Sequence, residues 1–314
     1  PDLQHLPRTR PRHLLGRQTR PHLFVLPRDM VRHAMRTHAM NAQPVTLRRP
    51  GLWSLAELDA HLCNDSKTTT TALPNGRPRT ANATWWPAVA TCPGSSSACR
   101  ADCYAVTLES FRHEVRRAAE RRRQDWNREL AAGNGAALAA ALMRRSRDRQ
   151  VDLGVTRPTF RIAASGDWWS AALVDAWREA AHQVDADDAE RLTVWGYSRS
   201  YGAGRDYLRR LLDPDTGLPP RGWTYYLSSD PSMLRRTVNA LRGDAYHALP
   251  VAMMAESSDE GRRLLEKVRR LAGDGPRRAL VCPVDADDMP RTVEVRGTYR
   301  GACSSCRACL PKQS

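Results

Sequence analysis

Long apolar runs are missing from this sequence of 314 residues, and no stretch of about eighteen apolar residues is available to cross a membrane. No basic segment followed by an apolar one marks a secretory signal. We therefore expect a protein of the cytoplasm with no membrane partner. Short-period repeats are also missing, which argues against a solenoid, and no histidine or serine stands out as the centre of a nucleophile system.

Eight cysteines need an explanation other than stability. A chain of this length can bury a core that does not depend on cross-links, and disulfide frameworks belong mainly to short secreted proteins. In a reducing compartment, clustered cysteines more often bind metal or take part in catalysis. The cysteines therefore predict a metal-binding protein.

A formal net charge of +15 and a pI near 10.1 favour a polyanionic partner such as nucleic acid, or equally reflect an arginine-rich genome. Much of the excess lies in residues 1–39, which show no helix or strand period. We expect this segment to be a disordered basic arm, or an upstream extension that the working protein does not need. A nucleic-acid-binding arm is the alternative.

Short apolar runs alternate with amphipathic helical stretches along most of the chain. The runs span residues 84–90, 160–165, 191–198, 223–229, 249–255 and 278–282. Strands that alternate with helices of this size pair in parallel through right-handed crossovers. The six units predict an α/β fold, a partial (β/α)6 barrel over residues 40–282, with a cysteine-rich C-terminal extension over residues 283–314.

Three cysteines follow the first expected strand. Cys92, Cys99 and Cys103 lie in a loop that also holds Gly94 and three serines. A flexible turn of this kind lets three sulfurs converge on one centre. Because three ligands leave one coordination position free, the arrangement suits a [4Fe–4S] cluster with one iron open to substrate or cofactor.

A second group of cysteines lies near the end of the sequence. Cys303, Cys306 and Cys309 are separated by two residues each, a spacing that matches ferredoxin iron–sulfur runs better than zinc sites. Cys282, at the end of the last expected strand, can supply a fourth ligand. Cys63 lies in an apolar-periodic stretch and is expected in the core. Zinc at both sites, or simple burial of some cysteines, is the alternative interpretation.

Polar side chains are expected at the carboxyl ends of the strands, where ligands of parallel sheets gather. Arg199, between two serines, can hold a carboxylate or phosphate bidentately. Glu256 can handle a proton or fix a loop. Together with Asp167 these two are the expected catalytic residues. Asp230 precedes Pro231, and we expect it first of all to cap a helix.

Arginines dominate the stretch after the first cysteine loop, where residues 106–130 predict one long helix. We expect a solvated outer face on this helix, with contact to backbone phosphates as the alternative. The tryptophan pairs at 85–86 and 168–169 are expected in the core or in the wall of a cofactor pocket, rather than stacked on bases.

The motif CPGSSSACRADCYA at residues 92–105 is similar to one in the phage gene product 88 family, whose members carry a CPG, a further cysteine and CYA. An SGD-aromatic-serine segment at 165–170 and a Tyr-x-Arg-Ser segment at 197–200 agree with that family, as do the later cysteines. The resemblance covers about Asn64 to Cys309. It implies a phage protein that works in the host cytoplasm.

The layout is also similar to that of radical S-adenosylmethionine enzymes, which place three cysteines after the first barrel strand and an acidic motif after the second. The similarity implies S-adenosylmethionine at the open iron, with Gly166, Asp167 and Tyr104 at the cofactor. The cysteine spacing departs from that superfamily, with gaps of six and three residues in place of three and two. The implied function is an enzyme acting on nucleic acid or a nucleotide. The rival is a non-catalytic nucleic-acid-binding protein whose zinc or iron–sulfur sites staple its loops.

Overall fold

The computed structural model describes residues 53–64, 80–101, 103–188, 192–202, 206–243, 245–273, 279–281, 292–295 and 298–301. The chain divides into two units, residues 1–48 and 49–314, and every described residue belongs to the second. The predictions for residues 1–39 and for Cys282, Cys303, Cys306 and Cys309 lie outside the described residues. Within them, no helix is both long and apolar enough to cross a membrane.

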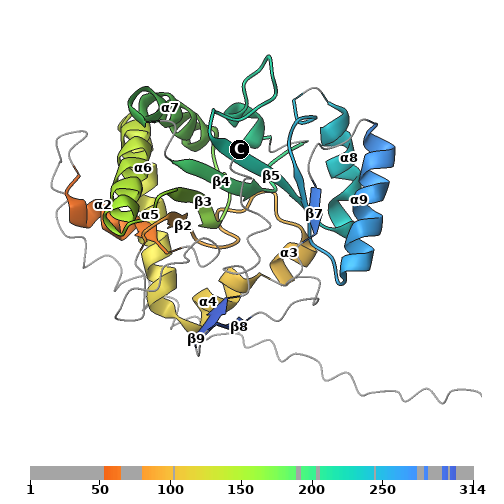
Figure 1. Cartoon of the computed structure of the whole chain (residues 1–314), viewed down its shortest axis with the longest axis horizontal. Helices are drawn as coiled ribbons and strands as arrows, with labels where there is room; N and C mark the ends of the chain where they lie inside the picture. The colour runs from red at the N-terminus through yellow and green to blue at the C-terminus, as the bar shows by residue number, and fades with distance from the viewer. Residues whose placement is uncertain are drawn as a thin grey trace, which may run out of the picture. The chain divides into compact units, whose positions relative to one another are not determined.

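A seven-stranded sheet forms the centre of a mixed α/β fold (Figure 1). Its strands, in their order across the sheet, are β1 (Leu62–Cys63), β2 (Ala83–Trp85), β3 (Thr159–Ser165), β4 (Thr193–Ser198), β5 (Trp223–Ser229), β6 (Val251–Met253) and β7 (Ala279–Val281). β1 pairs antiparallel with β2, and all later pairs are parallel. Each expected apolar run overlaps a strand, so the α/β prediction is confirmed.

Two short pieces of strand structure were not expected from the sequence. One is β1, which pairs with the edge of the parallel strands. The other is a separate antiparallel hairpin of β8 (Thr292–Val295) and β9 (Thr298–Gly301). Both are too short to show a clear period of two, which is the signal on which strand prediction depends.

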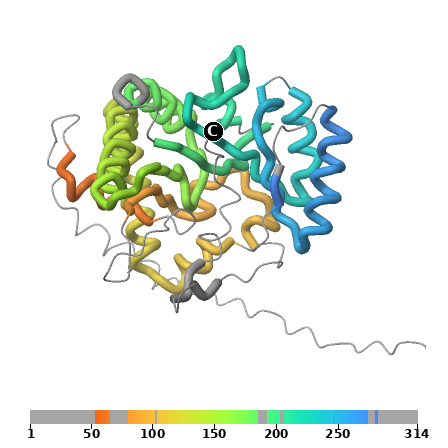
Figure 2. The backbone as a smooth tube through the Cα atoms, in the orientation of Figure 1, coloured from red at the N-terminus to blue at the C-terminus, as the bar shows by residue number. Residues whose placement is uncertain are grey.

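Helices lie along the sheet in chain order, with α5, α6 and α7 near β2 to β4 and α8 and α9 near β7 (Figures 1 and 2). The helices are α2 (Leu55–His61), α3 (Ser97–Ala101), α4 (Tyr104–Phe111), α5 (His113–Ala131), α6 (Gly135–Asp152), α7 (Ala171–Asp188), α8 (Leu234–Arg242) and α9 (Ser258–Ala272), with short 3-10 turns at Leu208–Leu211 and Pro231–Met233. The prediction of one helix over 106–130 was wrong. The backbone leaves helical geometry at Arg112 (φ −121°, ψ 87°), which separates α4 from α5.

The two faces of the sheet carry different side chains. Phe160 of β3 packs towards the helices, where its ring centroid lies 5.8 Å from that of Trp177 on α7. Its neighbour Arg161 points the opposite way, with its guanidinium carbon 5.0 Å from the centre of the Trp195 ring. Because adjacent strands keep this register, one face is apolar and covered by helices, whereas the other carries arginine and aromatic groups. Trp86 and Trp168 are buried in the helix-covered core, as predicted, whereas their neighbours Trp85 and Trp169 are half-buried.

Asp59 links α2 to α6, and its ion pairs should make the stability of the protein sensitive to acid. Its carboxylate accepts two hydrogen bonds of 2.8 Å from Arg145 and lies 3.0 Å from Arg149. The Arg145 hydrogen bond, helped by Arg149, holds the pKa of Asp59 below its usual value although burial opposes this. Stability from such a group is present above the unfolded-state pKa and is lost as the pH falls through the lower folded-state pKa.

We therefore expect the free energy of unfolding of Asp59→Asn to fall less than that of the wild type when the pH drops below about 4. Urea unfolding at several pH values measures this difference. Asp259→Asn is the control, because Asp259 forms only an exposed pair within one helix. Identical pH profiles for the wild type and Asp59→Asn would contradict this prediction.

Candidate metal centre

The first cysteine loop lies directly on the exits of the neighbouring strands. Gly94 is so close to the chain after β4 that an added Cβ would come within 1.9 Å of the Arg199 carbonyl oxygen and 2.8 Å of the Ser200 nitrogen. On the β3 side, the Asp167 N–H donates a 2.9 Å hydrogen bond to the Thr91 carbonyl, just before Cys92. The loop is thus docked at the carboxyl ends of β3 and β4.

Cys92, Cys99 and Cys103 are free, half-buried thiols that influence one another electrostatically. Burial, then the charge of Asp167, raises the pKa of Cys92 to about 12, and Cys99 and Cys103 add to this rise. Burial also raises the pKa of Cys99, whereas the positive charge of Arg199 opposes the rise. The loop therefore brings the three predicted sulfur atoms into one neighbourhood.

The described thiols are not grouped as ligands of a single ion. Across the described ranges, no three His, Cys, Asp or Glu side chains lie close enough together to hold one metal ion. A cubane cluster makes a different demand, because each of its cysteines binds a different iron and the sulfurs stand further apart. Three cysteines in one loop are a donor set that such a cluster can use.

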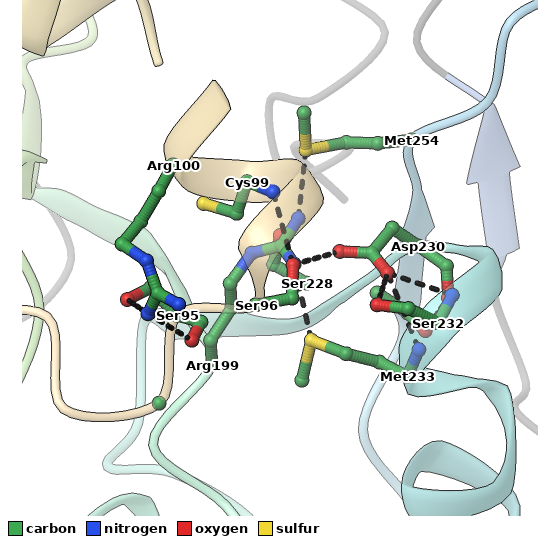
Figure 3. A network of polar contacts seen from close by, with 12 residues as sticks. Ser95, Ser96, Cys99, Arg100, Arg199, Ser228, Asp230, Ser232, Met233 and Met254 are labelled. Carbon is green, nitrogen blue, oxygen red and sulfur yellow. Dashed lines mark hydrogen bonds and ion pairs between the residues drawn. The ribbon is translucent and has the colours of Figure 1, made fainter. Parts of the chain in front are cut away.

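Ser96 links the cysteine loop to two other strand ends (Figure 3). Its hydroxyl accepts a 3.0 Å hydrogen bond from the Cys99 backbone N–H and donates a 2.5 Å bond to an Asp230 oxygen. A guanidinium nitrogen of Arg199 also lies 3.3 Å from this hydroxyl. The backbone position of Cys99 therefore depends on residues that follow β4 and β5.

Arg199 and Asp230 form a buried ion pair beside Cys99 (Figure 3). The same guanidinium donates to the sulfurs of Met233 and Met254 at 3.0 and 2.8 Å. The second Asp230 oxygen accepts from the backbone N–H groups of Ser232 and Met233 at 2.9 and 3.2 Å. The predicted capping role of Asp230 is confirmed. Burial alone would raise the pKa of Asp230, but hydrogen bonds from Ser232, Ser96 and Arg199 lower it overall.

Asp167 joins the exit of β3 to the exit of β4. One of its oxygens accepts from the Trp168 N–H at 2.7 Å and the Ser198 hydroxyl at 2.8 Å. The other accepts from the Arg199 N–H at 2.7 Å and the Ser200 hydroxyl at 3.0 Å. Burial raises the pKa of Asp167, and these hydrogen bonds oppose the rise. Both oxygens are occupied by the protein itself, so the geometry favours a positioning role.

The family model for gene product 88 matches residues 53–312, a range that includes the docked loop and its partners. The chain belongs to the gene product 88 family. The resemblance expected from the cysteine motif is thereby confirmed. No curated protein and no solved structure matches this gene product 88 chain.

The other predicted site residues of this gene product 88 chain lie at different distances from the loop. Gly166 has a positive φ of 81°, and an added Cβ would come within 2.3 Å of the Thr91 hydroxyl, so it shapes the turn under the loop. Tyr104 begins α4, and its hydroxyl donates to the Ala164 carbonyl. Glu256 is exposed, and its backbone N–H donates to Glu260 at the start of α9. Among the described residues, no hydrogen bond or ion pair joins Glu256 to the cysteines.

Sequence reasoning missed three residues of this gene product 88 site. Ser96 was only one of several loop serines, and nothing local distinguishes the one that contacts Asp230. Met233 and Met254 appeared to be ordinary apolar residues, yet both sulfurs contact Arg199. Their one available signal was position, because each lies just beyond a strand at the carboxyl edge of the sheet.

Proposed function

We propose that this member of the gene product 88 family is an iron–sulfur enzyme in which Cys92, Cys99 and Cys103 hold a [4Fe–4S] cluster. One observation carries the proposal. Three half-buried thiols, each within electrostatic reach of the others, follow the first parallel strand at the edge of the sheet where ligands gather. A loop serving stability alone has no need of three free thiols in one neighbourhood.

The proposed architecture is a partial β/α barrel resembling that of radical S-adenosylmethionine enzymes. In a barrel of this type each strand neighbours the preceding one, and the helices form the outer layer. The order of β2 to β7 and the single helix-covered apolar face support this proposal. β1 adds an antiparallel strand at the open edge.

The chain's own residues would position such a centre in definite ways. When bound, the cluster would offer one open iron and, with S-adenosylmethionine, the electron that begins radical chemistry. Ser96 fixes the Cys99 backbone, and Asp167 fixes the turn that supports Cys92. Because Asp167 is fully engaged, we assign it to positioning rather than to direct contact with S-adenosylmethionine. The remaining predicted ligands, Cys282, Cys303, Cys306 and Cys309, would hold a second cluster.

We expect the anaerobically purified protein to contain iron and sulfide and to give an electron paramagnetic resonance signal after reduction. Changing Cys92, Cys99 and Cys103 together to serine should remove the iron of one cluster and leave that of the second. Cys63→Ser is the matched control, since Cys63 is a half-buried cysteine on β1 outside the loop, and it should keep all the iron. A colourless protein with stoichiometric zinc would contradict the proposal and favour metal-stapled loops in a non-catalytic protein.

The enzymatic part of the proposal needs a separate measurement. We expect the reduced, iron-loaded protein to release 5'-deoxyadenosine from S-adenosylmethionine and to act on a nucleic acid or nucleotide, as the net charge of +15 suggests. The cysteine-triple variant is the background sample. Iron binding without 5'-deoxyadenosine above this background would retain the cluster and overturn the radical chemistry.

A further inference from the structure

Helix α4, which begins directly after Cys103, has an unusual distribution of side chains. Phe111 is 82% exposed and Tyr104 is 55% exposed, whereas Glu109 is only 7% exposed. The two aromatic residues are seven positions apart and therefore share one side of the helix. A buried acid and an exposed Phe111 ring are the reverse of a normal surface helix. Tyr104 is held by the protein, since its hydroxyl donates to the Ala164 carbonyl and its ring centroid lies 5.9 Å from that of Trp85.

The burial of Glu109 has a local cause. Its carboxylate accepts hydrogen bonds of 3.1 Å from the Trp85 indole and 3.1 Å from the Ala88 backbone N–H. These contacts hold α4 to the turn that leads from β2 into the cysteine loop. Glu109 therefore anchors the inner side of α4. This anchor does not require the Phe111 ring to be exposed.

Exposed arginines follow Phe111 in the chain, over the first turns of α5. Arg112, Arg116, Arg117 and Arg121 are exposed, and none of them forms a salt bridge within the described part of the chain. Several other arginines on α5 and α6 form ion pairs, for example Arg123 with Glu120, Arg128 with Asp125 and Arg145 with Asp59. Arg117 and Arg121 lie one helical turn apart on the outer side of α5.

We propose that this aromatic–arginine surface, made of Phe111, Arg112, Arg116, Arg117 and Arg121, binds single-stranded nucleic acid beside the cysteine loop. Aromatic rings stack on unpaired bases, and arginines neutralise the phosphates that flank them. A duplex hides its bases and cannot use Phe111 in this way. This inference rests on the proposed function for one point, the substrate class. The binding surface itself does not include the cysteines.

The apolar groups of α5 argue against a lipid surface as the occupant. A helix that lies on a membrane inserts a continuous apolar face into it. On α5 Ala119 and Trp126 are fully buried in the protein core, and Val115, Ala118 and Leu130 are half-buried. On α4 the exposed Val106 and Phe111 are five positions apart, so they lie on different sides of the helix and form no continuous apolar face.

The test is fluorescence anisotropy with a labelled oligothymidine and with a labelled duplex of equal length, over a series of salt concentrations. Phe111→Ala should weaken oligothymidine binding roughly ten-fold, the loss of one stacked base, and should change duplex binding little. Arg117→Glu/Arg121→Glu should weaken binding further and reduce the slope of log K against log salt by about 1.4, for two lost phosphate contacts.

The matched control is Arg263→Glu/Arg270→Glu on α9, which makes the same charge change at two exposed arginines. Equal losses in both double variants would overturn the proposal, because net charge alone would then explain the binding. Equal effects of Phe111→Ala on both nucleic acids, or binding of anionic vesicles that depends on Phe111, would also overturn it. Iron content is measured on the same samples. A protein that lacks iron but still binds oligothymidine through Phe111 would contradict the proposed iron–sulfur enzyme and leave the binding surface supported.

Discussion

Replacing Asp230 with alanine is expected to lower the free energy of unfolding by about 3–5 kcal/mol, because it leaves the Arg199 guanidinium buried without its carboxylate. The substitution also removes the acceptor of two backbone N–H groups at the start of the Pro231–Met233 turn. Urea unfolding measures the loss. The cysteine loop should loosen at the same time, because Ser96 loses its partner.

Two further variants separate the buried charge from other causes. Adding Arg199→Met to Asp230→Ala removes the stranded charge and should restore part of the stability. Asp175→Ala breaks the pair with Arg210, in which the arginine is 49% exposed, and should cost less than about 1 kcal/mol. If Asp230→Ala were no more harmful than Asp175→Ala, the Arg199 pair would not hold the site together.

The second large effect is expected at Gly94. Gly94→Ala places a methyl group against the backbone of Arg199 and Ser200, which cannot rotate away as a side chain does. Overpacking of this kind costs about 1–3 kcal/mol, and here relief requires the loop to lift off the sheet. We expect lower stability in urea and loss of the iron proposed for Cys92, Cys99 and Cys103.

Gly243→Ala provides the control for this substitution. Gly243 follows α8 with an ordinary negative φ of −82°, and its added Cβ would meet the Ala240 carbonyl at 3.4 Å. Its effect should stay within about 0.5 kcal/mol, with iron unchanged. Similar behaviour of the two variants would show that the loop tolerates a side chain at position 94 and is not tightly docked.

The sequence patterns were strongest for buried strands and for helix caps. β3, β4 and β5 lie within apolar runs long enough to be recognised, and Asp230 followed by Pro231 is a local cap signal. Such features depend on neighbouring residues, so a single sequence contains them. The break between α4 and α5 lacked this kind of signal, because no glycine or proline marks Arg112.

The site was predictable in its residue types and much less so in its connections. Cys92, Cys99 and Cys103 stood out by spacing, and the strand order explained why Asp167 and Arg199 lie near them. The partners of these groups were not predictable. Ser96 meets Asp230 across a separation of 134 residues, and no local pattern encodes such a contact.

That separation also constrains the order of events during synthesis of the protein. The cysteine loop emerges early, but its anchor on Asp230 exists only after β5 has been made and has joined the sheet. Contacts between distant parts of a chain form late, because a long loop must close first. The loop therefore reaches its docked position only after β5 has joined the sheet, and any cofactor that it holds is fixed there no earlier.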